Sequence, residues 1–309
     1  MDEKQENHSE NKLERGPILT WIVSIISVCI FVGLLQERDN QSWEAVSAWG
    51  YFPPDAIWDG KYWALLTSVF VHIEPLHLLF NLYWLWVLGG AVERAIGSAK
   101  WIIFFIAAAV ISSGIQFATS STTGIGLSGV VYGLFGFIWI SKAHFSAFEK
   151  ILPKQTVAMF IAWAFLCILL TLLKIWNIAN EAHFAGLLFG ICIAYLFILK
   201  YKVRLMLTGL IVLTMLAIMP LFWCPWSAIW VSKQGIDAYN KGNYQSAINW
   251  YQKSLRQGQD PVWAWSNIAL AYKAMGNDQQ FNEAIEQLRK LDSGRAKEIE
   301  DSFIENKKE

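Results

Sequence analysis

The sequence has little charge, few cysteines and no excess of charge of either sign. Only 16% of its 309 residues are charged and 55% are hydrophobic, whereas soluble proteins average about 25% charged and roughly 45–50% apolar residues. Basic and acidic residues number 25 each, so the charge balance does not point to a nucleic-acid partner. The four cysteines lie in apolar runs without CxxC spacing, which predicts neither a disulfide framework nor a metal site. We therefore expect a protein of the lipid bilayer that has no metal or other cofactor.

The long hydrophobic runs predict seven membrane-spanning helices. A helix needs about 20 apolar residues to cross a hydrocarbon core of about 30 Å. Seven runs approach that length, at residues 17–35, 76–92, 101–118, 126–141, 156–173, 182–199 and 205–223. The fourth run is short, so we expect its helix to begin below the membrane surface, covered by its neighbours. The first run lacks a cleavage-site pattern and therefore predicts a retained helix and not a signal peptide.

Basic residues predict the orientation, because lysine and arginine are enriched in cytoplasmic connections. Apart from the long C-terminal tail, the opposite set of connections carries only Arg38, Lys61 and Lys174. The favoured set carries Lys4, Lys12, Arg15, Arg94, Lys100, Lys142, Lys150, Lys154, Lys200, Lys202 and Arg204. We therefore expect a multi-pass plasma-membrane protein with a cytoplasmic N-terminus and, after seven crossings, an extracellular C-terminal domain. One missed or false helix would reverse the side of that domain.

Residues 226–309 differ from the rest, since they hold eleven basic and eleven acidic side chains and an internal repeat. The dipeptides Gly242-Asn243 and Gly276-Asn277 recur 34 residues apart, and the surrounding segments resemble tetratricopeptide repeats (TPRs). Two such units are fewer than the three or so that a stable stack needs. A terminal helix near 294–306, the membrane part or a second chain is expected to complete the stack. The alternative is an amphipathic helical spacer that binds no ligand.

The fold class predicted from these features is all-α, a polytopic membrane helix bundle with a small helical C-terminal domain. The predicted parts are a cytoplasmic polar tail at 1–16, a six-helix core at 17–200, a seventh helix at 201–225 and the TPR-like domain at 226–309.

Three motifs place polar side chains inside predicted spans, where such residues are costly and often functional. HLLFN puts His77 and Asn81 one turn apart on one helix face, so both can donate hydrogen bonds to a common point. In GLSGVVYG, Ser128 lies in the first helical turn, where unpaired N–H groups favour negative charge. In AHFAGLLFG, His183 begins the sixth helix. Taken singly, the His–Asn pair is equally typical of interhelical hydrogen bonding, and a serine at a helix start is usually only a cap.

Glycines accompany the serine and the second histidine. Gly126 and Gly129 remove side-chain bulk beside the serine, and we expect this space to admit a substrate backbone. Gly186 and Gly190 lie on the same helical stripe as the histidine. A stripe of small residues allows close helix contact, so we expect the helices that carry the serine and the histidine to approach each other.

The predicted topology places the four polar residues in the same outer leaflet, because the second, fourth and sixth helices all run from outside to inside. No acidic side chain is placed to orient His183, since Glu181 is too near in sequence. We therefore expect a Ser–His dyad. Such a pair with convergent donors fits acyl transfer, in which histidine removes the serine proton and the donors stabilise an oxyanion.

Together these motifs resemble those of the rhomboid intramembrane serine proteases over about residues 17–200. The GxSG motif of that family is matched at 126–129, its HxxxN motif at 77–81 and its AHxxGxxxG motif at 182–190. The seventh helix and the repeats make the chain similar to bacterial rhomboids that carry C-terminal TPRs.

The resemblance implies a role for each matched residue. Ser128 would be the nucleophile and His183 its base, with Tyr132 packed on the imidazole. His77, Asn81 and the Ser128 N–H would form the oxyanion hole. It also implies an endopeptidase that cleaves transmembrane protein substrates near the outer face. Separately, we expect the TPR-like tail to bind a protein partner or substrate. One departure concerns the first large outer loop, where the family often has Trp-Arg and this chain has Trp63-Ala64, so the anchoring of that loop is not predicted.

Two other functions fit parts of the pattern. A catalytically inactive relative would bind membrane proteins without cleaving them, but such proteins usually lack the serine or the histidine, and both are present. A transporter would use the polar cluster as a solute site, but the sequence shows no inverted repeat and no midplane carboxylates.

Overall fold

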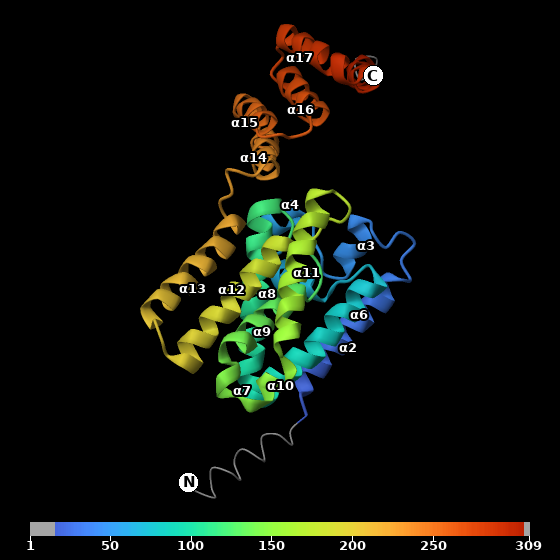
Figure 1. The fold of residues 1–309 in the computed structure, drawn as a ribbon. Helices are drawn as coiled ribbons and strands as arrows, with labels where there is room; N and C mark the ends of the chain where they lie inside the picture. Colours follow the sequence, from blue (N-terminus) through green and yellow to red (C-terminus); the bar gives the residue numbers. More distant parts are fainter. Residues whose placement is uncertain (1–15, 306–309) are drawn as a thin grey trace, which may run out of the picture. The chain divides into compact units, whose positions relative to one another are not determined.

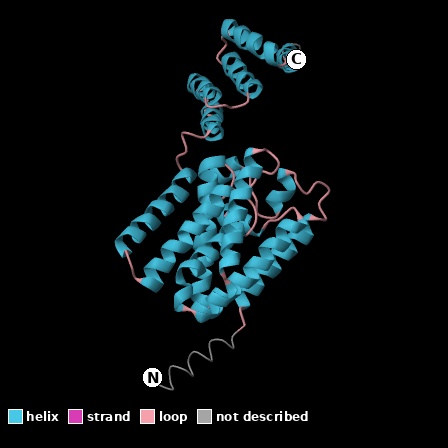
Figure 2. Cartoon of the chain, viewed as in Figure 1, coloured by secondary structure: helices cyan, strands magenta, loops and turns pink. Residues whose placement is uncertain are grey.

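The computed structural model describes residues 16–305, and within that range it contains helices and no strands (Figures 1 and 2). The predicted polar tail at 1–16, with Lys4, Lys12 and Arg15, therefore falls outside the described residues except for Gly16. The chain divides into two compact units, Met1–Phe222 and Trp223–Glu309. The all-α prediction is confirmed for the described residues.

Each of the seven predicted spans overlaps a helical segment of the first unit. These are α2 (Ile18–Leu34), α6 to α7 (Pro75–Trp84, π-helical η2 Leu85–Gly89, Gly90–Ile96), α8 (Ser98–Ser120), α9 (Ser128–Ser141), α11 (Lys154–Leu172), α12 with π-helical η4 (Asn180–Ala194, Tyr195–Leu199), and α13 with η5 (Val203–Ile218, Met219–Leu221). Five are long and apolar enough to cross a membrane: Pro75–Ile96, Ser98–Ser120, Lys154–Leu172, Asn180–Leu199 and Val203–Leu221. The apolar helix α2 is shorter, with 17 residues, and α9 has 14.

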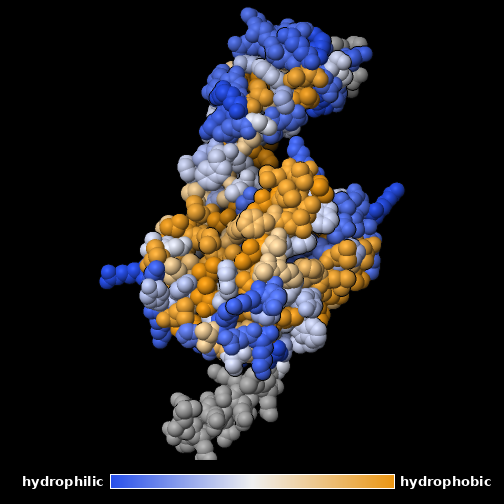
Figure 3. Space-filling view, in the orientation of Figure 1, coloured by the Kyte–Doolittle hydropathy of each residue, from blue (hydrophilic) through white to orange (hydrophobic). Residues whose placement is uncertain are grey.

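Helix α9 lies inside the first unit, and every residue from Gly129 to Ile138 is buried. A helix covered on all sides by protein does not have to match the thickness of the lipid layer. This explains how α9, with only 14 residues, can lie among membrane-spanning helices. In α11 and α13, by contrast, only 11% of the apolar window is buried. Figure 3 shows hydrophobic residues gathered on the viewed surface of this unit, as expected for helices that face lipid.

The buried carboxylate of Glu93 in α7 joins the starts of α2 and α8. Glu93 is 2% exposed and accepts hydrogen bonds from the Leu19 and Thr20 N–H groups at 2.9 and 2.8 Å. It also accepts from the Thr20 and Ser98 hydroxyls at 2.8 and 2.7 Å. The first N–H groups of a helix have no partner within the helix, so Glu93 supplies the cap that Pro17 cannot.

The first connecting segment, residues 35–74, contains short helices and packs through two apolar clusters. The helices are α3 (Trp43–Ala48), α4 (Pro54–Trp58), α5 (Ala64–Thr67) and the 3₁₀ turn η1 (Ser68–Phe70). One cluster joins Ala45 and Val46 to Leu34, and the other joins Ile57 and Leu65 to Phe117 and Leu221. Ala64, where the resemblance leads us to expect arginine, is fully buried in the second cluster. Apolar packing therefore anchors this segment.

After α9 the chain forms η3 (Lys142–His144) and α10 (Ser146–Ile151) before α11 begins. Phe148 of α10 is fully buried and its ring lies 6.3 Å from that of Phe137. This short helix thus closes one end of the core around α9.

The second unit consists of two helical hairpins and a final helix. The helices are α14 (Ala228–Asn240), α15 (Tyr244–Arg256), α16 (Pro261–Ala274), α17 (Asp278–Leu291) and α18 (Ser293–Glu305). Gly242 and Gly276, in the turns of the two hairpins, have φ values of +77° and +72°, a backbone conformation that glycine adopts without strain.

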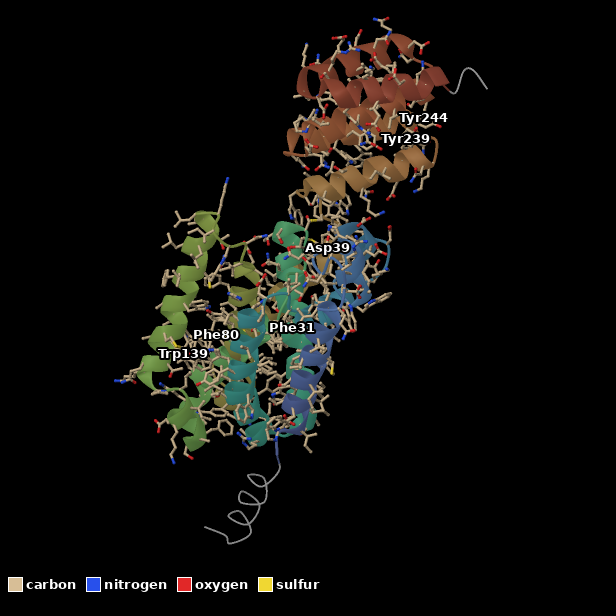
Figure 4. The ribbon with its side chains drawn as sticks, turned by 90° about the vertical axis from the view of Figure 1, so that its right-hand side faces the viewer. Phe31, Asp39, Phe80, Trp139, Tyr239 and Tyr244 are labelled. Carbon is tan, nitrogen blue, oxygen red and sulfur yellow. The ribbon has the colours of Figure 1, made fainter. Side chains whose placement is uncertain are left out.

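Side-chain packing closes the first hairpin of the second unit, between α14 and α15. A Cβ atom at Gly235 would lie 2.6 Å from Tyr251 Cδ1, and the rings of Tyr239 and Tyr244 lie 5.2 Å apart (Figure 4). Helix α18 lies where the sequence predicts a terminal helix, and it buries Ala296 and Ile299 in the core of this unit. The unit therefore has a core of its own.

Candidate active site

Ser128 is the first residue of α9 and follows a loop with two glycines in the left-handed region. Gly124 and Gly126 have φ values of +69° and +93°, which residues with a Cβ atom adopt only with strain. The first N–H groups of α9 have no carbonyl partner within the helix. The serine hydroxyl therefore lies beside donors that favour negative charge.

The structure brings Ser128 and His183 together. His183 is the fourth residue of α12, is 6% exposed, and its Nε2 lies 2.8 Å from Ser128 Oγ. The buried Nδ1 of His183 has no hydrogen-bond partner among the described residues. When Nε2 accepts the serine proton, the ring carries its own proton on Nδ1. Among the described residues, the serine and the histidine therefore form a hydrogen-bonded pair, and no third side chain bonds to the histidine ring.

Tyr132 orients the histidine ring by stacking. It lies one turn after the serine on α9, and its ring centroid is 4.7 Å from that of His183 with an interplanar angle of 21°. Its hydroxyl donates to the Phe160 carbonyl of α11 at 3.4 Å. The tyrosine is 4% exposed, so its ring has little freedom to move away from the imidazole.

Glycines hold α9 and α12 in direct backbone contact. A Cβ atom at Gly186 would overlap the Gly129 carbonyl oxygen, and a Cβ atom at Gly190 would overlap that of Gly133. Any side chain at these positions would push the two helices apart. Because the serine and the histidine lie at the starts of these helices, the backbone contact sets the distance between them.

The space beside the serine loop is filled by other side chains. A Cβ atom at Gly126 would lie 2.6 Å from His77 Cε1, and one at Gly129 would lie 2.6 Å from the Ser112 hydroxyl oxygen. The sequence leads us to expect room for a substrate backbone at these glycines. The difference arises because His77 of α6 packs against the loop and Ser112 of α8 packs against the first turn of α9.

His77 and Asn81 lie one turn apart on α6, as their spacing predicts. The half-buried His77 ring packs against Gly126, two residues before the serine. Asn81 is 5% exposed, and its Nδ2 donates to the His77 carbonyl of its own helix at 3.0 Å. One of its two amide hydrogens is used in this way. Both residues are therefore on the element that covers the serine loop.

His72 also belongs to this site, although the sequence places it only in a connecting segment. It has no exposed surface, and its ring lies 4.9 Å from that of His77. Its Nδ1 lies 3.1 Å from the Phe70 carbonyl, and its Nε2 accepts the Leu127 N–H at 3.4 Å. Burial lowers the pKa of His72 to about 3, with a further contribution from His77. The ring is therefore neutral, with its proton on Nδ1, and it holds the backbone immediately before Ser128.

Gln116 of α8 positions the start of α12. Its Oε1 accepts the Ala182 N–H at 3.1 Å, and its Nε2 donates to the Ser120 hydroxyl at 3.0 Å. Ser112, Gln116 and Ser120 recur every four residues on α8 and therefore share one face. This polar stripe in an apolar run is a sequence signal of function that could have identified Gln116.

The site can perform nucleophilic chemistry with groups already in contact. A serine hydroxyl within hydrogen-bond reach of a histidine ring nitrogen is the arrangement that activates the oxygen as a nucleophile. Among residues 16–305, no three His, Cys, Asp or Glu side chains are grouped so that they could hold a metal ion.

Comparison with known proteins finds one matching family model, and the similar proteins carry the same family name. A family model described as the Rhomboid domain matches residues 59–200. A protein described as rhomboid protease GlpG from Salmonella choleraesuis (strain SC-B67) is 32% identical over 197 residues, which cover 62% of this chain and 67% of that protein. The protein of the same description from Salmonella paratyphi A (strain ATCC 9150 / SARB42) is 31% identical over the same length.

Proposed function

Because the chain belongs to the rhomboid family of membrane proteases, we propose that Ser128 and His183 form its catalytic dyad. The observation that carries the proposal is the 2.8 Å contact between Ser128 Oγ and His183 Nε2. The substrate class is transmembrane proteins, and the cut lies in or beside a transmembrane helix near the outer membrane face.

The proposed reaction proceeds in two acyl-transfer steps. His183 Nε2 takes the proton of the Ser128 hydroxyl while Oγ attacks the substrate carbonyl carbon. The imidazolium then gives that proton to the leaving amine as the peptide bond breaks, and an acyl-enzyme remains. In the second step the histidine takes a proton from water while the resulting hydroxide attacks the ester carbonyl carbon. The bond between that carbon and Oγ then breaks, the imidazolium returns the proton to Ser128, and the carboxylic product leaves.

The oxyanion is proposed to bind the Ser128 N–H, the His77 ring and the second amide hydrogen of Asn81. The N–H at the start of α9 has no helical acceptor, and Asn81 donates only one amide hydrogen to its own helix. Each such donor typically contributes about 3 kcal/mol to transition-state stabilisation.

Substrate must present an unwound backbone to this site. Carbonyl groups in a helix are already hydrogen-bonded, so helix-breaking residues are expected near the cleaved bond. Helix α11 is the largely lipid-exposed neighbour of the site, with 11% of its apolar window buried, and its Phe160 ring contacts Tyr132 at 5.6 Å. We place substrate entry at this helix.

Cleavage of a model transmembrane substrate in liposomes tests the proposal. Wild type should release fragments, whereas Ser128→Ala and His183→Ala should not. Ser141→Ala is the matched control, since it removes a buried hydroxyl at the other end of α9 that donates to the Phe137 carbonyl at 2.6 Å. Equal product from wild type and Ser128→Ala would refute the dyad and favour an inactive relative that binds membrane proteins.

The second unit is proposed to be a TPR-like domain that binds a protein partner or the external part of a substrate. The support is the 34-residue spacing of the glycine turns and the stacking of two helical hairpins with a closing helix. Deleting residues 226–309 should impair cleavage of native substrates more than cleavage of a minimal peptide. Equal impairment of both would favour a spacer without a ligand.

The orientation proposed from the basic residues places the N-terminus in the cytoplasm and residues 226–309 outside. Protease added to intact cells should then remove the second unit. Protection of this unit until the cells are lysed would reverse the assignment.

A further inference from the structure

Helix α13 packs closely on α8, although much of its surface is exposed. A Cβ atom at Gly114 of α8 would lie 2.8 Å from Ala217 Cβ, and Ala217 is fully buried. Met215 and Leu216, on other faces of α13, are 64% and 47% exposed. At this point α13 and α8 meet through two small residues, Gly114 and Ala217.

The C-terminal end of α13 also holds the first connecting segment. The Trp58 indole N–H of α4 donates to the Pro220 carbonyl of η5 at 2.9 Å. Leu221, which is 6% exposed, packs in one buried cluster with Ile57 and Leu65. The Trp58 ring lies 5.2 Å from that of Phe117 on α8. Residues more than 150 positions apart in the sequence thus share one polar bond and one apolar cluster.

The same connecting segment holds the backbone before the serine. The Ser68 carbonyl, directly after α5, accepts the Gly126 N–H at 3.3 Å. His72 accepts the Leu127 N–H at 3.4 Å. Both N–H groups of the two residues preceding Ser128 are therefore bound by the segment that η5 anchors. The end of α13 is therefore linked to Ser128 through the connecting segment, by contacts at each end of that segment and by the chain between them.

We propose that the end of α13 positions the catalytic serine through this segment, with Trp58 and Leu221 as positioning residues. The inference rests on the proposed dyad. A connection of this kind acts on the orientation of the Ser128 hydroxyl and N–H, so it should affect the chemical step more than substrate binding.

The test uses full-length protein in liposomes and two readouts taken well below the unfolding temperature. One is kcat and KM for a transmembrane substrate, and the other is the acylation rate of Ser128 by a small fluorophosphonate probe. Trp58→Phe removes one N–H and keeps an aromatic ring, and Leu221→Ala opens the cluster from the α13 side. Both should lower kcat and the probe rate roughly 3- to 30-fold, the usual range for substitutions in a coupled network, with little change in KM.

Controls separate positioning from stability. Leu216→Ala changes an exposed leucine of the same helix and should behave as wild type, and Leu221→Met should restore most of the rate. If folded Trp58→Phe and Leu221→Ala match wild type in both readouts, the inference is overturned. It is also overturned if Leu216→Ala is slowed as much as they are. Wild type that reacts no faster than Ser128→Ala would instead overturn the proposed dyad.

Discussion

Three histidines meet around the serine loop and use their ring nitrogens differently. His183 presents Nε2 to the serine and leaves Nδ1 without a partner among the described residues. His72 uses both ring nitrogens on backbone groups, and His77 packs its ring on Gly126. The chemical role of each histidine therefore depends on the partners of its two nitrogens.

The low pKa of His72 predicts a pH dependence of stability. Below the unfolded pKa of about 6.5, the unfolded chain binds a proton that the folded chain, with a pKa of about 3, does not. The contribution of His72 to the free energy of unfolding is therefore complete above pH 6.5. It decreases as the pH falls toward 3, and at pH 5 the decrease amounts to about 2 kcal/mol. His72→Gln should lower stability at pH 7 but reduce the further loss between pH 7 and pH 5. Thermal unfolding in detergent at both pH values measures this.

The exposed His144 provides the control for that experiment. His144→Gln should leave the difference between the two pH values as in wild type. If His72→Gln keeps the full pH dependence of wild type, His72 is not the group that titrates on unfolding.

At the scale of elements, the contact between α9 and α12 is the feature on which the site depends. Four glycines bring the two backbones together, and Gly136 continues the contact against the Leu187 carbonyl. A packed interface of this kind cannot take up added atoms without moving a helix. The position of His183 relative to Ser128 therefore follows from the packing of whole helices.

Gly186→Ala should abolish most activity, because its Cβ atom would overlap the Gly129 carbonyl oxygen. Overpacking costs about 1–3 kcal/mol, and a displacement of about 1 Å at the site can cost about 100-fold in rate. Gly209→Ala is the matched control, since among residues 16–305 its Cβ atom would meet only the Cys192 sulfur, at 3.7 Å. Substrate cleavage and thermal unfolding should be measured for both variants. Activity of Gly186→Ala equal to that of Gly209→Ala would contradict this account.

Helix positions could be predicted well from the sequence, because the length and polarity of a run determine where a span lies. The short run at 126–141 is α9, and its burial explains its length. The π-helical turns at Leu85–Gly89 and Tyr195–Leu199 were not predicted, since π-turns have no simple hydropathy signal. His72 could not be predicted either, because hydropathy does not reveal that a connecting segment folds back onto the serine loop. Ser128 and His183 could be paired because each begins a predicted helix.

At the scale of the whole molecule, the two units have different means of stabilisation. The first contains most of the apolar residues and exposes many of them, including Leu172 and Phe197 at 74% and 68%. The second carries its ion pairs on the surface, such as Arg295 with Glu298 at 2.7 Å, over a separate core that includes Ile268 and Leu288. Figure 3 shows the corresponding hydrophilic surface.

Residues 223–309 should therefore fold alone in water and unfold cooperatively when followed by circular dichroism. Ile268 is fully buried, so Ile268→Ala should destabilise the isolated unit by about 2–4 kcal/mol. Ile236→Ala, at a position that is 39% exposed, should have a much smaller effect. A fragment without a cooperative transition would show that this core is insufficient.

The glycine contact between α9 and α12 also affects how freely the sequence can vary. Because the main chains of α9 and α12 touch directly, the distance between Ser128 and His183 depends on backbone atoms. Backbone atoms are the same in every amino acid, so most side chains of these helices do not affect that distance. Exposed positions of α12 such as Phe184 and Leu188, 42% and 50% exposed, can then vary among apolar residues without changing that separation. Only the glycines of the contact itself are restricted, because any side chain larger than a hydrogen atom would separate the two helices.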